Sequence, residues 1–168
     1  MNDKQKLLRH FLAALAYRTQ KALRGAPADF GTFQAGNEIR TPAELIRHMT
    51  SVLGYARTFF IGGRYKAEPL PSLHEEIIRF HDMLQELGRH IETGNPLLNQ
   101  MSEERLLQGP LSDAMTHAGQ LAMLRRLADV PVPPENFVFA EINAERLGVD
   151  QAKPVKPDEN WPEAPKRL

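Results

Sequence analysis

The stretch Leu111–Leu127, LSDAMTHAGQLAMLRRL, predicts the helix around which we expect the rest of the chain to fold. Nearly every position carries a good helix former or a small residue, and apolar side chains surround most of the circumference. A helix that is apolar on more than one side is usually buried. We therefore expect this segment to be the central rod of the fold.

Three polar side chains interrupt this stretch on a single face. Asp113 and His117 are four residues apart, and Gln120 follows three residues later, so all three point the same way on a helix. A buried carboxylate and a buried imidazole need a partner, because isolated buried polar groups are costly. A metal ion is one such partner.

Helix-start signals and apolar periodicity predict three further long helices. Apolar residues recur at helical spacing over Lys4–Leu23, and two capping boxes open helices over residues 41–61 and 72–91. With Leu111–Leu127, these segments predict an all-α fold, an up-and-down four-helix bundle.

Two shorter segments complete the expected organisation of the chain. Asn136 caps a short extra C-terminal helix expected over Phe137–Leu147, so that residues 1–150 form one domain. Residues 151–168 contain four prolines and are expected to form an extended tail. This tail is either a strap pinned to the surface by Trp161 or disordered.

Composition excludes several classes of function. Lysine plus arginine (21) equals aspartate plus glutamate (21), which argues against binding to nucleic acid or to an anionic membrane. The absence of cysteine excludes disulfides and thiolate metal sites and fits a reducing compartment. The N-terminus lacks a secretory signal, and no apolar run approaches the ~20 residues that span a bilayer. We therefore expect a soluble, cytoplasmic protein.

A third candidate ligand lies on the helix expected over residues 41–61. His48 is on its inward stripe, three residues after Leu45 and four before Val52. Metal sites of helical bundles are built from side chains on facing helices. His48, Asp113 and His117 are therefore the three protein ligands expected of an open catalytic site, with Gln120 orienting a ligand.

A plainer interpretation needs no metal. His48 and the Asp113–His117 pair would then simply hydrogen-bond each other across a helix interface. His81 is expected to be a satisfied core or boundary histidine. Four phenylalanines would either wall a pocket or belong to the core: Phe30, Phe33, Phe59 and Phe60.

Three motifs together resemble the DinB/YfiT-like superfamily of metal-dependent enzymes. They are IRTPAELIRHM at Ile39–Met49, HAGQL at His117–Leu121 and EINAERLG at Glu141–Gly148. The resemblance covers most of the chain and rests on the order and spacing of these motifs. It implies a four-helix bundle, often dimeric, whose metal is held by three histidines. One comes from the second helix, and two lie four apart on the fourth helix.

This sequence departs from that pattern at one ligand. His48 matches the first histidine and His117 the third, but Asp113 stands at the middle position. Aspartate is an acceptable ligand for zinc, nickel, iron or manganese, harder than imidazole and anionic. We expect a less Lewis-acidic site than one with three histidines; the alternative is a member that has lost its metal.

Two classes of function are compatible with these residues. The first is a metal-dependent enzyme that transfers a low-molecular-weight thiol to a small molecule or hydrolyses one, with the loop Phe30–Asn37 shaping the pocket. The same ligand set also occurs in non-haem iron oxygenases. The second class is a catalytically silent bundle, either a small-ligand-binding or a dimeric stress-response module. An open cavity beside converging ligands would favour the enzyme. The resemblance implies a homodimer in either case.

Overall fold

The computed structural model describes residues 1–156, and the regular elements in this part of the chain are helical. The long helices are α1 (Asp3–Leu23), α2 (Pro42–Ile61), α3 (Leu73–Glu92) and α5 (Ser112–Leu127). The short elements are η1 (Phe30–Thr32), α4 (Glu103–Leu106), η2 (Leu107–Leu111) and η3 (Phe137–Phe139). The prediction of an all-α fold is confirmed. Within residues 1–156, none of the helices has the length and apolarity needed to cross a membrane.

Both predicted helix starts are present. The Thr41 backbone N–H donates to Glu44 Oε2 at 2.9 Å, and the Glu44 N–H donates to Thr41 Oγ1 at 3.3 Å, with Pro42 at the first helical position. At the start of α3, Ser72 Oγ accepts from the Glu75 N–H at 3.2 Å. These bonds satisfy N–H groups that have no partner within a helix, and so fix where α2 and α3 begin.

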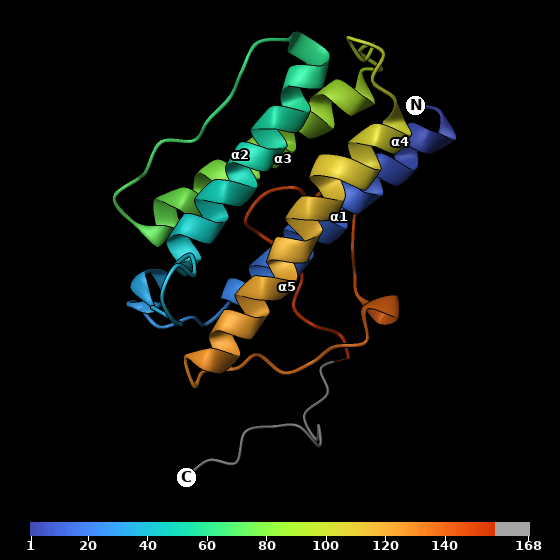
Figure 1. Cartoon of the computed structure of the whole chain (residues 1–168). Coiled ribbons are helices and arrows are strands. Elements are labelled where there is room, and N and C mark those ends of the chain that lie inside the picture. Colours follow the sequence, from blue (N-terminus) through green and yellow to red (C-terminus); the bar gives the residue numbers. More distant parts are fainter. Residues whose placement is uncertain (157–168) are drawn as a thin grey trace.

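Helices α2 and α3 run parallel to each other. Near the start of both helices, Arg47 of α2 lies 3.8 Å from Glu76 of α3. Further along both helices in the same direction, Arg57 of α2 lies 2.8 Å from Glu86 of α3. The connection over residues 62–72 therefore returns along the length of this pair instead of forming a tight turn (Figure 1). In an up-and-down bundle, consecutive helices run in opposite directions. The predicted up-and-down order therefore does not hold between α2 and α3, which run in the same direction.

Helices α1 and α5 form the second parallel pair. Near their starts, Lys4 lies 2.6 Å from Glu104, which just precedes α5. Near their ends, Arg125 donates to the Ala22 carbonyl at 3.1 Å. Arg125 is only 4% exposed and also donates to the carbonyls of Arg24, Gly25 and Val130. It is therefore an internal clamp on the end of α1, not the ordinary solvent-directed arginine that its position suggests.

The hydrophobic core lies between the α2–α3 pair and the α1–α5 pair (Figure 1). Helix α5 packs against α1 and α2 through one face, while Met123 and Leu127 on its other side are 54% and 52% exposed. The expectation that this segment is a buried central rod is wrong. Within residues 1–156, α5 is one of the four long helices around the core, and α1 and α2 are the long helices that cover it.

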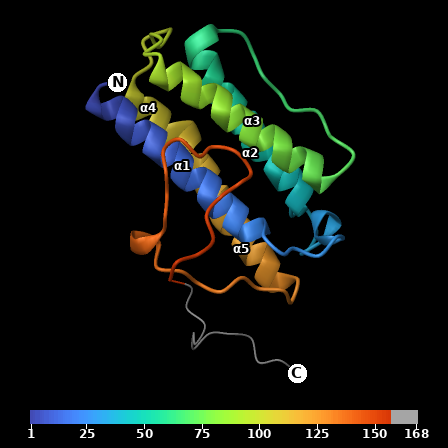
Figure 2. The same ribbon diagram turned by 180° about the vertical axis from the view of Figure 1, so that it is seen from behind.

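The C-terminal segment differs from the predicted helix over Phe137–Leu147. Only η3 forms, with Asn136 Oδ1 accepting from the Val138 N–H at 3.2 Å. Beyond η3 the chain crosses the back of α1 (Figure 2). There Arg9 donates to the Ala144 carbonyl and His81 Nδ1 lies 2.8 Å from the Leu147 carbonyl. Side chains of α1 and α3 thus bind backbone carbonyls near the end of this segment.

The first residues of the predicted tail follow α1 as an extended strap. Arg24 donates to the carbonyls of Gln151 and Ala152 at 2.9 and 3.0 Å. Gln151 is buried and donates to the carbonyls of Arg146 and Gly148. The predicted contact of Trp161 lies outside the described residues.

Candidate metal site

His48 of α2 and Asp113 and His117 of α5 converge at the interface between the two helices. One potential ligand atom from each lies within 4.8 Å of the other two. The imidazole rings of His48 and His117 are 4.7 Å apart between centroids and meet edge to face, at 79°. Asp113 Oδ1 lies 3.4 Å from His117 Nε2. The three side chains predicted from sequence therefore lie together and could hold a metal ion.

A kink precedes Asp113. Within Leu107–Leu111, Gly109 departs from helical geometry (φ −92°, ψ −105°) and separates the preceding turn from α5. Pro110 lacks an N–H and its ring crowds the preceding turn, which explains the kink. Ser112 Oγ donates to the Leu107 carbonyl at 2.7 Å and so satisfies a freed acceptor. The kink sets the direction in which α5 carries Asp113.

Gln120 fixes the orientation of the His117 ring. Its Oε1 lies 2.7 Å from His117 Nδ1. Since an amide oxygen only accepts hydrogen bonds, Nδ1 carries the proton and Nε2 presents a lone pair. Nε2 is buried and has no hydrogen-bond partner in the described chain. The predicted role of Gln120 as an orienting residue therefore fits this geometry.

His48 is kept in its neutral form. Burial is the main cause that lowers its pKa below the ordinary value of 6.5, and the positive charge of Arg40 acts in the same direction. The carboxylate of Asp113 opposes them and only partly offsets the shift. A neutral imidazole is the form that binds metal.

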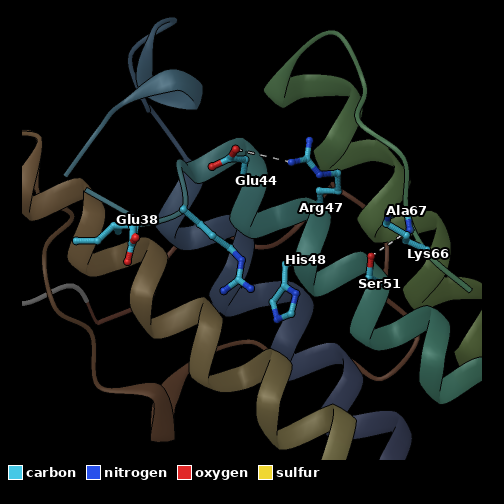
Figure 3. Close-up of a pocket in the computed structure, with 9 residues that line it drawn as sticks. Glu38, Glu44, Arg47, His48, Ser51, Lys66 and Ala67 are labelled. Atoms are coloured by element: carbon cyan, nitrogen blue, oxygen red, sulfur yellow. Dashed lines mark hydrogen bonds and ion pairs between the residues drawn. The ribbon is translucent and has the colours of Figure 1, made fainter. Parts of the chain in front are cut away.

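One cavity borders His48 and another borders Asp113, whereas the buried His117 lines neither. The first has a volume of about 360 Å³, and His48 lies on its wall with its ring directed toward α5 (Figure 3). The second has a volume of about 690 Å³ and includes Asp113 in its lining. Ser51 lines both cavities. Small molecules can therefore approach His48 from one side and Asp113 from the other.

The charged lining of the first cavity was not predicted from the sequence. Its charged residues, besides His48, are Glu38, Arg40, Glu44, Arg47 and Lys66. Arg40 had a signal in the sequence, because it directly precedes the N-cap of the helix that carries His48. Lys66 had none, since it belongs to the aperiodic connection over residues 62–72. The loop Phe30–Asn37 does not line either cavity; the residues that follow it do.

The phenylalanines considered as pocket walls belong to the core instead. Phe30 and Phe59 are buried in the hydrophobic cluster, and Phe33 and Phe60 pack against it. His81 is a buried core histidine, as expected, but it is satisfied only through Nδ1, because its Nε2 has no hydrogen-bond partner within residues 1–156.

The plainer interpretation of the three polar side chains is met only in part. His117 Nε2 lies 3.4 Å from Asp113 Oδ1, which is an ion pair if the imidazole is protonated, but no hydrogen bond joins His48 to either of them within residues 1–156. The space beside them is open, as the two cavities show.

Comparison with known proteins found no match: no family model fits the chain, and neither a curated protein nor a solved structure is significantly similar to it. The DinB resemblance therefore stays a prediction from the sequence motifs.

Proposed function

We propose that this chain is a DinB-like metal-dependent enzyme with a four-helix-bundle fold. His48, Asp113 and His117 would hold one divalent ion: zinc, nickel, iron or manganese. The observation that carries the proposal is the convergence of three ligand atoms from two helices, one of which, His117 Nε2, is buried without a hydrogen-bond partner within residues 1–156.

The donor atoms present fit such an ion. Because Nδ1 of His117 is taken by Gln120, its Nε2 lone pair faces the Asp113 carboxylate, another acceptor, at 3.4 Å. Two acceptors repel each other unless a metal ion, or a proton on Nε2, lies between them. Two imidazoles and a carboxylate suit zinc, manganese, iron and nickel. When bound, the ion would supply Lewis-acid polarisation of a substrate or activation of a thiol or water.

The chain's own residues would then orient the reactants. His48 and Asp113 each border a different cavity, and Ser51 borders both. A small molecule in one cavity and a low-molecular-weight thiol or water in the other would meet at the three side chains. We propose thiol transfer or hydrolysis on this basis, with no nucleic-acid or membrane partner.

The homodimer implied by the resemblance is part of the proposal. An apolar groove between α1 and α4 includes Leu7, Phe11 and Leu107, and Leu7 is 71% exposed. A second copy that covers this groove would remove apolar surface from water. The same groove favours the alternative function, a catalytically silent dimeric or ligand-binding module.

An activity screen separates the two functions. The full chain, loaded in turn with zinc, nickel, manganese and ferrous iron, is assayed for consumption of low-molecular-weight thiols by small electrophiles and for ester and amide hydrolysis. We expect turnover with at least one metal, and its loss in His117→Ala but not in His74→Ala, which removes an exposed histidine at the start of α3. No turnover with any metal would favour the silent module, and equal turnover in His117→Ala would contradict the proposed metal site.

A further inference from the structure

We propose that the 360 Å³ cavity beside His48 binds a carboxylate or phosphate group of the substrate through Arg40 and Lys66. The inference rests on the proposed function, because it names the charge class of the small molecule brought to the three ligands. It concerns residues outside that ligand set.

The positive charge of the cavity is only partly neutralised by the protein. Arg47 lies 3.9 Å from Glu44 and 3.8 Å from the buried Glu76. Arg40 and Lys66 are exposed and lack a carboxylate within ion-pairing distance in the part of the chain that the structure describes. Two cations on one small cavity repel each other unless an anion joins them.

The two carboxylates of the lining do not fill this role. Glu44 accepts a hydrogen bond from the Thr41 N–H as part of the α2 cap and faces Arg47. Glu38 is exposed and, in Figure 3, lies on the opposite side of His48 from Lys66. The lining therefore keeps a surplus of positive charge. A divalent ion held with the single carboxylate of Asp113 would increase this surplus, and an anionic group on the substrate would offset it.

The available donors match the geometry of an oxyanion. The Arg40 guanidinium is a planar fork that pairs with two oxygens of a carboxylate or phosphate, and Lys66 adds a mobile point charge. Ser51 Oγ accepts a hydrogen bond from the Ala67 N–H at 3.0 Å, so its own O–H is free to donate to a ligand. The same bond ties the connection that carries Lys66 to α2. An anion held here lies beside His48, on the wall of the same cavity.

The test is calorimetric titration of the full-length protein with succinate and, separately, with inorganic phosphate; neutral succinamide serves as the uncharged probe. Each titration is performed on metal-loaded protein and after chelation. We expect one of the two anions to bind in both states, and succinamide in neither. Arg40→Gln and Lys66→Gln should each weaken binding about tenfold, the loss expected for one charge-assisted hydrogen bond. Arg64→Gln, an exposed arginine of the same connection that lies outside the cavity lining, should not.

Several results would overturn the inference. The first is an equal affinity for the anion in wild type and all variants. The second is anion binding that disappears when the metal is chelated. The third is a loss of affinity in Arg64→Gln as large as that in Arg40→Gln and Lys66→Gln. Metal content measured on the same samples separates the two proposals. Wild-type protein that binds no metal but binds the anion would contradict the proposed enzyme. If Arg40→Gln and Lys66→Gln then weaken anion binding, the anion site is supported.

Discussion

At the scale of single residues, the candidate site depends on how buried histidines are satisfied. His117 has one ring nitrogen held by Gln120 and the other without a partner in the described chain, whereas His48 is kept neutral by its surroundings. Spacing alone predicted that Asp113, His117 and Gln120 share a face. It could not predict the tautomer of His117 or the influence of Arg40, since both depend on contacts made in three dimensions.

His81 gives a pH dependence that does not involve the site. Burial lowers its pKa below the ordinary 6.5, and the hydrogen bond to the Leu147 carbonyl opposes this only partly. A histidine whose pKa is lower in the folded state takes up its proton preferentially in the unfolded state. Its contribution to stability is therefore complete above about pH 6.5 and is lost as the pH falls below that value.

We therefore expect the free energy of unfolding to fall between pH 7 and pH 5, and to fall less in His81→Asn. The asparagine amide can keep the donor to the Leu147 carbonyl but does not titrate. Urea denaturation of both proteins at the two pH values measures the difference. The same loss in both proteins would show that His81 is not responsible.

At the scale of elements, the local signals in the sequence predicted the starts of α2 and α3 but not their relative direction. A capping box is a local hydrogen-bond pattern, so Thr41–Glu44 and Ser72–Glu75 are readable from the chain. The parallel course of α2 and α3 depends on the path of residues 62–72, which has no period. The helix predicted over Phe137–Leu147 is absent, and the contacts that hold this segment instead come from Arg9 and His81, which are distant in sequence.

Gly54 allows the connection over residues 62–72 to lie against α2. A Cβ placed on Gly54 would lie 1.9 Å from Tyr65 Cδ1, so the ring would have to move. We expect Gly54→Ala to lower the free energy of unfolding by about 1–3 kcal/mol, as in other overpacked sites. Gly119→Ala on α5 meets nothing within 4 Å and should raise it by about 0.5–1 kcal/mol through helix propensity.

Urea denaturation of the two variants beside wild type measures both effects. A Gly54→Ala protein as stable as Gly119→Ala would contradict the close packing of Tyr65. The connection also carries Lys66, next to Tyr65. Titration of Gly54→Ala with the anion therefore shows whether a displaced Tyr65 also changes anion binding in the cavity.

At the scale of the whole molecule, two parallel helix pairs bring α2 and α5 together so that His48, Asp113 and His117, distant in sequence, meet in a group that could hold a metal ion. The all-α class and the convergence of these three side chains were predictable, because apolar periods and inward-facing polar residues are properties of single helices. The cavities were not, since their walls combine α2, α5, η2 and two aperiodic connections. The one-sided burial of α5 was missed because an apolar circumference does not tell how many neighbours cover it.

The central claim is that His48, Asp113 and His117 hold a metal ion, and elemental analysis of the purified, untagged protein tests it most directly. Wild type is compared with Asp113→Ala and His117→Ala, and with His74→Ala as the matched control, after incubation with zinc, nickel, manganese and ferrous iron. We predict about one metal ion per chain in wild type and in His74→Ala, and its loss in the other two variants. Wild type without metal, or His117→Ala that retains it, would contradict the claim.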